Sequence, residues 1–94
     1  MTKSGVVSTT SSSIFICSEK NGNSIVKMRF TNADSYTLNI SLYTAKTKKT
    51  ITLYDLVLDA GDTVTDNLKY ELEQGDQLIA SSNRSKTFYT LNVE

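Results

Sequence analysis

The clearest pattern along the chain is a strict alternation of apolar and polar residues in several short segments. Within residues 24–31, Val26, Met28 and Phe30 fall on one face, and the two residues between them, Lys27 and Arg29, fall on the other. A period of two residues is typical of a β-strand with one buried face. The sequence therefore predicts a half-buried strand over this segment.

The same kind of pattern recurs along the rest of the chain. Further short strands are predicted over residues 13–17, 37–43, 50–58, 63–65, 67–72, 77–81 and 87–93. Within 50–58 the apolar positions change phase between Leu53 and Leu56, which predicts a β-bulge or bend. The segments between strands contain turn residues, such as Asn21-Gly22. Seven or eight short strands without a helical period predict an all-β fold, an antiparallel β-sandwich or a jelly-roll-like barrel.

The N-terminal segment breaks this pattern. Residues 1–12 are polar, rich in Ser and Thr, and show no periodicity. They predict a flexible N-terminal arm, with residues 13–94 forming a single β-sandwich domain. An arm that becomes ordered on a neighbouring subunit is the alternative.

The amino-acid composition argues against most kinds of catalytic and metal-binding site. The 94 residues include no histidine and one cysteine, Cys17, which excludes an internal disulfide and makes a zinc site or a histidine-based catalytic site untenable. Cys17 lies in an apolar run and is expected to pack as a small apolar side chain. The ten basic and ten acidic residues cancel, so nothing in the overall charge favours nucleic acid or an acidic membrane as a partner. No catalytic, cofactor-binding or metal-binding residue is predicted, and the chain is not expected to be an enzyme.

A chain this short has a thin core, which favours support from partner subunits. With disulfides and zinc excluded, we expect a homo-oligomer.

Three groups of residues leave a choice between a local structural role and binding. The acidic turns ending at Asp62 and Asp76 could cap backbone N–H groups or bind calcium. The basic cluster of Lys46, Lys48 and Lys49 could be solvated or contact phosphates. The tyrosines Tyr36, Tyr43 and Tyr54 could pack internally or form a glycan-binding patch.

The order of these motifs resembles a class of small β-sandwich virion proteins of tailed bacteriophages. The matching segments are Phe30-Thr31-Asn32, Leu38-Asn39-Ile40-Ser41-Leu42-Tyr43, Leu58-Asp59-Ala60-Gly61-Asp62-Thr63 and Leu72-Glu73-Gln74-Gly75-Asp76-Gln77-Leu78-Ile79-Ala80-Ser81. The resemblance covers residues 13–94 and depends on order and spacing, since each motif alone is a strand followed by a turn. Residues 1–12 have no counterpart in it.

The resemblance implies a non-enzymatic structural role in the virion. The expected function is that of a capsid decoration or cement protein, assembled in the host cytoplasm and docked as a homo-oligomer on the major capsid protein. A tail, neck or fibre-attachment component is the first alternative, and a carbohydrate-binding β-sandwich module is the second. The class brings no catalytic residues.

Overall fold

The alternating segments form strands because each sheet buries one face against the other. The computed structural model describes all residues, 1–94, and contains nine strands. They are β1 (Thr2–Val7), β2 (Ser12–Ile16), β3 (Asn23–Thr31), β4 (Tyr36–Thr44), β5 (Lys49–Leu58), β6 (Thr63–Asp66), β7 (Tyr70–Leu72), β8 (Gln77–Ser82) and β9 (Thr87–Val93). The chain forms no helix of the length and apolar character needed to cross a membrane.

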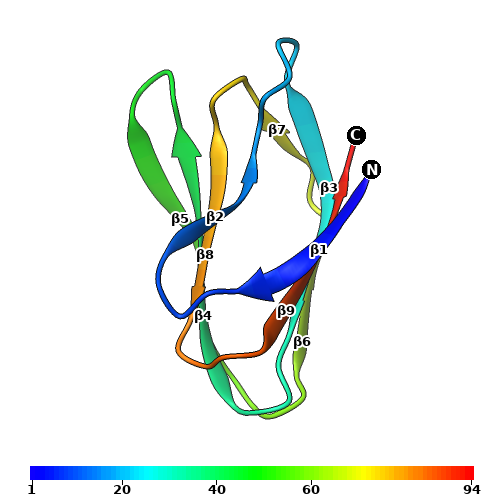
Figure 1. The fold of residues 1–94 in the computed structure, drawn as a ribbon, viewed down its shortest axis with the longest axis vertical. Helices are drawn as coiled ribbons and strands as arrows, with labels where there is room; N and C mark the ends of the chain where they lie inside the picture. Colours follow the sequence, from blue (N-terminus) through cyan, green and yellow to red (C-terminus); the bar gives the residue numbers. More distant parts are fainter.

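The strands make two antiparallel sheets that face each other (Figure 1). The five-stranded sheet has the order β1-β9-β3-β6, with β7 also paired to β3, and the four-stranded sheet has the order β2-β8-β4-β5. This arrangement confirms the predicted all-β sandwich. Eight of the strands correspond to predicted ones, and the ninth is β1.

The core lies between the sheets and is built from the predicted inward residues. Met28 and Phe30 on β3 face Leu38 and Ile40 on β4, and all four side chains are buried. Cys17 is buried in the same core cluster, and its Sγ lies 3.4 Å from Asn23 Oδ1. It therefore packs inside the domain, as predicted.

Three β-bulges interrupt the strand pairing, and one of them lies at Ile14, between β2 and β8. Between β4 and β5 the register shifts at Leu53, next to the predicted change of phase. Between β3 and β9 it shifts at Val26, so that Ile25 is fully buried and Val26 is not. The prediction that Val26 faces the core is therefore wrong, because an extra residue in one strand reverses the alternation on its far side.

Where the sequence predicts a flexible arm, the structure places strand β1. Residues 2–7 pair antiparallel with β9, and Val7 is 1% exposed between the sheets. At Gly5 the side chain of Tyr89 lies directly over the backbone, so that a Cβ would sit 2.7 Å from Tyr89 Oη. Most of the burial on this edge is supplied by β9 and not by β1 itself.

The docking of β1 leads to a first prediction. Val7→Ala should lower the free energy of unfolding by about 1.5 kcal/mol, because it removes two buried carbon atoms and leaves a gap in the core. Val6→Ala should change it by less than about 0.5 kcal/mol, because Val6 is 57% exposed. Urea unfolding at a protein concentration where the chain is monomeric measures both values. Equal, small effects would instead indicate a free arm.

Candidate interaction surfaces

The two acidic turns have the same geometry. Gly61 and Gly75 both have positive φ angles, of 79° and 94°. In each turn the aspartate after the glycine accepts a hydrogen bond from the backbone N–H three residues earlier. Asp62 Oδ2 lies 3.2 Å from the Asp59 N, and Asp76 Oδ2 lies 2.9 Å from the Glu73 N. Both carboxylates therefore cap their own turns.

The turns do not join into a metal site. They lie at opposite ends of the sandwich (Figure 1). Asp76 is buried, and its Oδ1 accepts a further hydrogen bond of 3.0 Å from the Ala45 N. Its two oxygens thus hold a turn and the β4–β5 hairpin together. The structure contains no group of three or more His, Cys, Asp or Glu side chains that could hold a metal ion.

A third acidic residue, Asp66, forms a polar cluster between the sheets. Tyr54 on β5 and Tyr70 on β7 both donate hydrogen bonds from Oη to Asp66 Oδ2, the second at 2.6 Å. The Leu68 N donates to Asp66 Oδ1 at 2.7 Å. These bonds connect the edge strands of the two sheets, since Tyr54 belongs to the four-stranded sheet and Asp66 to the five-stranded one.

The hydrogen bonds of this cluster determine its ionisation. Burial raises the pKa of Asp66, but the hydrogen bonds from Tyr54, Tyr70 and the Leu68 N–H outweigh burial and hold that pKa below its ordinary value. Burial, followed by the hydrogen bond to Asp66, raises the pKa of both tyrosines. The carboxylate is therefore charged, and its tyrosine partners are neutral hydrogen-bond donors. Such a cluster stabilises the fold and offers no free base or nucleophile.

The three tyrosines considered as a glycan-binding patch do not share a surface. Tyr36 is buried and donates a hydrogen bond of 2.7 Å from Oη to the Asp62 carbonyl. Tyr54 points inward to Asp66, and only Tyr43 lies on the outer face of the four-stranded sheet. Two of the three therefore have the packing role that the sequence offered as the alternative.

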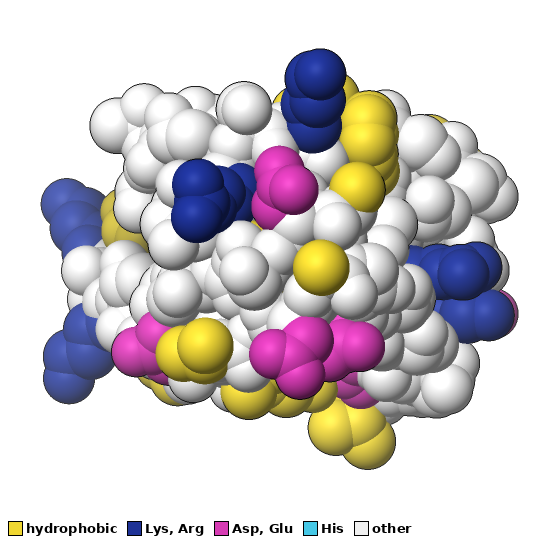
Figure 2. Space-filling model, turned by 90° about the horizontal axis from the view of Figure 1, so that it is seen from below, with side chains coloured by type: hydrophobic (Ala, Val, Ile, Leu, Met, Phe, Trp, Pro, Cys, Tyr) yellow, Lys and Arg dark blue, Asp and Glu magenta, His cyan; other side chains and the backbone are white.

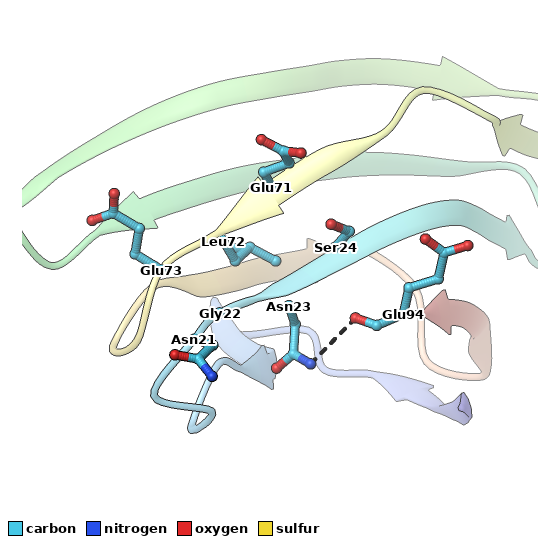
Figure 3. Close-up of a pocket in the computed structure, with 8 residues that line it drawn as sticks. All are labelled: Asn21, Gly22, Asn23, Ser24, Glu71, Leu72, Glu73 and Glu94. Carbon is cyan, nitrogen blue, oxygen red and sulfur yellow. Dashed lines mark hydrogen bonds between the residues drawn. The ribbon is translucent and has the colours of Figure 1, made fainter.

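The largest hollow, of about 590 Å³, is shallow and polar (Figure 3). It is lined by Asn21, Gly22, Asn23, Ser24, Glu71, Leu72, Glu73 and Glu94. The carboxylate groups of Glu71, Glu73 and Glu94 lie apart from one another, and Asn23 is already bonded to the Glu94 carbonyl at 3.3 Å. Three carboxylates that do not converge do not form a binding site, so this hollow carries no ligand assignment.

The three clustered lysines lie at the tip of the β4–β5 hairpin. Lys46 and Lys48 are in the turn, Lys49 begins β5, and all three are exposed. The structure shows one ion pair, at 4.0 Å, between Lys69 and Glu71, so the hairpin lysines face solvent. Charges at a hairpin tip of this kind discourage pairing with another sheet.

The exposed large hydrophobic side chains are concentrated at the two long edges of the sandwich. We define the β1–β2 edge by Met1, Val6, Ile16 and Phe88, where Phe88 of β9 is the cross-strand neighbour of Val6. We define the β5–β6 edge by Ile51, Val57 and Leu68. β2 and β5 are the outer strands of one sheet, and β1 and β6 are those of the other. The two sets therefore lie on opposite sides of the molecule.

The sequence predicts the position of only some of these exposed hydrophobic residues. Within the predicted strand 67–72, Leu68 has the two-residue spacing to share a face with Tyr70 and Leu72, but its side chain is 64% exposed in the connection between β6 and β7. That prediction is wrong because the strand begins only at Tyr70. Phe88 is exposed on the outer face of β9, whereas Tyr89 and Leu91 are buried, as the alternation along the predicted strand 87–93 indicates.

Comparison with known proteins supports the fold. Neither a protein-family model nor a curated protein sequence matches the chain. Two crystal structures of a pentameric capsid protein isolated from metagenomic phage sequences are similar to it, with TM-scores of 0.57 and 0.55 and 18% sequence identity. Each match covers 99% of this chain and 60% of the other, so this chain spans about 60% of the length of those proteins. The similarity at this identity is one of fold.

Proposed function

We propose that this protein is a non-enzymatic structural component of a phage virion, and more specifically a decoration or cement protein of the capsid. The observation that carries this proposal is the match of almost the whole chain to pentameric phage capsid proteins. The order of motifs in the sequence supports the same role independently of that match. The protein would act as a homo-oligomer docked on the major capsid protein, in virions assembled in the host cytoplasm.

The side-chain chemistry agrees with a role in assembly. The one buried carboxylate outside a turn, Asp66, is already engaged by three hydrogen-bond donors. The largest hollow is polar and its carboxylates lie apart from one another. The apolar side chains that remain exposed are gathered on the two edges, where burial against another protein would stabilise an assembly.

Co-sedimentation with virions tests this proposal. Purified protein is mixed with particles that lack it, and the bound fraction is measured over increasing protein concentration. We expect saturable binding at a fixed ratio to the major capsid protein, whereas a heat-denatured sample of the chain should stay in the supernatant. Binding confined to isolated tails would contradict decoration and favour a tail or neck component. Binding to neither would contradict the virion role, and a glycan array would then test the carbohydrate-binding alternative.

A further inference from the structure

The outer face of the five-stranded sheet carries two cations near its centre. Lys27 and Arg29 of β3 are exposed on this face, whereas Met28 between them is buried in the core. β3 is an inner strand of the sheet, with β9 on one side and β6 and β7 on the other. Residues two positions apart on a strand lie about 7 Å apart. Two like charges at this spacing repel each other, and an anion bound against both would remove the repulsion.

The residues directly opposite these cations are uncharged. Lys27 pairs with Asn92 of β9, and Arg29 lies between Thr90 of β9 and Thr65 of β6. The one ion pair of the structure involves neither cation. Both positive charges are therefore held on the rigid centre of a sheet without a carboxylate bound to them.

The acidic side chains of the same sheet lie elsewhere. Glu71 and Glu94 line the larger polar hollow described above, whose lining includes neither Lys27 nor Arg29. Asp66 accepts its hydrogen bonds between the sheets. Figure 2 looks onto one end of the sandwich, with the five-stranded sheet on the right as in Figure 1. Basic side chains project from this right flank, whereas acidic side chains gather along the lower rim.

A second hollow, of about 120 Å³, lies over β3 and β9 and is lined by the two cations together with Thr90 and Asn92. Each of these four side chains can donate a hydrogen bond, from an ammonium, guanidinium, hydroxyl or amide group. The Oγ1 of Thr90 accepts a hydrogen bond of 3.5 Å from Ser4 Oγ, which leaves its own hydrogen free to donate. Four donors around one small space, two of them charged, match a negatively charged group with several acceptor oxygens.

We propose that this hollow binds a single phosphate group. The oxygens of a tetrahedral phosphate point in several directions and can accept hydrogen bonds from both strands, whereas the two oxygens of a carboxylate lie in one plane. Arginine, lysine, threonine and asparagine side chains are common phosphate ligands. Because the ten basic and ten acidic residues of the chain cancel, the site suits one phosphate group and not an extended nucleic-acid backbone. This binding activity is separate from the proposed virion role.

Titration with inorganic phosphate tests the site. The amide signals of the isotope-labelled chain are followed by NMR while sodium phosphate replaces sodium chloride at constant ionic strength and pH 7. We expect saturable changes at Lys27, Arg29, Thr90 and Asn92. Arg29→Gln should raise the apparent Kd for phosphate at least about tenfold, because it removes charge-assisted hydrogen bonds. Thr90→Val keeps the charge and the shape but loses the hydroxyl, and should raise it about threefold.

Lys46→Gln is the matched control, because it removes the same charge from the tip of the β4–β5 hairpin, outside the hollow. Its Kd should stay within about twofold of the wild-type value. Equal weakening in Arg29→Gln and Lys46→Gln would reveal a general charge effect and overturn the proposal. Changes that do not saturate would also overturn it, and so would equal binding of acetate, which would favour a carboxylate-bearing partner instead.

A short oligothymidylate distinguishes the two sources of a phosphate group. Tighter binding of the oligonucleotide than of inorganic phosphate, at the same four residues, would assign the phosphate to a nucleic acid. Weaker binding would assign it to a free phosphate or a small phosphorylated molecule. These measurements use the purified chain alone, so their outcome is independent of capsid binding.

Discussion

Replacing Asp66 with alanine is expected to lower the free energy of unfolding by about 3 kcal/mol. The side chain is 6% exposed and accepts hydrogen bonds from Tyr54, Tyr70 and the Leu68 N–H. Its removal leaves these three donors without their acceptor, and a buried donor without a partner costs about 1–3 kcal/mol. The total cost of the three unpaired donors is reduced because both tyrosines are only half-buried, so water reaches part of the space that the carboxylate leaves.

Two substitutions separate the hydrogen bonds from other effects. Asp66→Asn keeps one acceptor oxygen but loses the charge, so its cost should be about half that of Asp66→Ala. Asp34→Ala is the matched control, because this aspartate is exposed and its carboxylate makes no hydrogen bond, and it should change stability by less than about 0.5 kcal/mol. Urea unfolding at pH 7 measures all three. Similar losses for Asp66→Ala and Asp34→Ala would contradict the importance of the cluster.

The same cluster predicts the response of stability to pH. The pKa of Asp66 in the folded protein is held below the ordinary value of 3.8, so the unfolded chain binds the proton more tightly. The stabilisation by the charged carboxylate is therefore complete above about pH 4 and is lost as the pH falls through the folded-state pKa. Asp66→Asn has no titrating group here, so its stability should fall less steeply between pH 5 and 2. Parallel pH profiles for the wild type and this variant would contradict the assignment.

Asp66 loses its stabilising effect at low pH, whereas Tyr54 and Tyr70 lose theirs at high pH. The pKa of Tyr54 and that of Tyr70 are raised above the ordinary value of 10.0, chiefly by burial and then by Asp66. Because the folded-state pKa is raised, the stabilisation by the neutral tyrosines is complete below pH 10 and is lost as the pH rises through the higher folded-state value. The link between the two sheet edges is therefore strongest from about pH 4 to pH 10.

Much of the fold could be predicted because alternation is a local signal. Met28 and Phe30 on β3, and Tyr89, Leu91 and Val93 on β9, face the core as their spacing indicates. The bulge at Leu53 was also predictable, since apolar residues on both sides of it reveal the change of phase. The bulge at Val26 was not, because Ile25 and Val26 are adjacent and either one could have faced inward.

Strand β1 could not be recognised from its own residues. Its inward positions are Lys3, Gly5 and Val7, of which only the last is apolar. The apolar surface on this edge comes from Tyr89 and Leu91 of β9, which lie opposite Gly5 and Lys3. A strand whose burial is supplied by its partner has no amphipathic pattern to detect.

The Asp66 cluster was missed for a related reason. The stretch from residue 59 to residue 76 is rich in acidic residues, and nothing local distinguishes Asp66 from Asp59 or Asp62. Its role depends on Tyr54, which reaches it from the opposite sheet. Contacts across a sandwich are set by how the sheets stack, and this cannot be derived from spacing along one strand. The division of the exposed apolar residues between two edges is hidden in the same way, because it depends on strand order.

Replacing Gly22 with alanine is expected to lower the free energy of unfolding by about 3 kcal/mol, whereas Gly61→Ala should cost only about 1 kcal/mol. Both glycines have a positive φ angle, 84° for Gly22 and 79° for Gly61, and an alanine there is strained by about 1–2 kcal/mol. The two positions differ in the space around them. A Cβ at Gly61 meets nothing within 4 Å, but a Cβ at Gly22 would lie 2.4 Å from the Leu72 carbonyl oxygen.

This contact involves backbone and cannot be relieved by rotating a side chain. Leu72 pairs with Asn23, the residue after Gly22, so relief requires β7 to move away from β3 (Figure 3). Urea unfolding of the two variants measures the difference, and hydrogen exchange at the Leu72 and Asn23 amides locates it. Equal losses would mean that the φ angle alone limits this position. A larger loss for Gly22→Ala, with faster exchange confined to β3 and β7, would show that close approach of the two strands requires glycine.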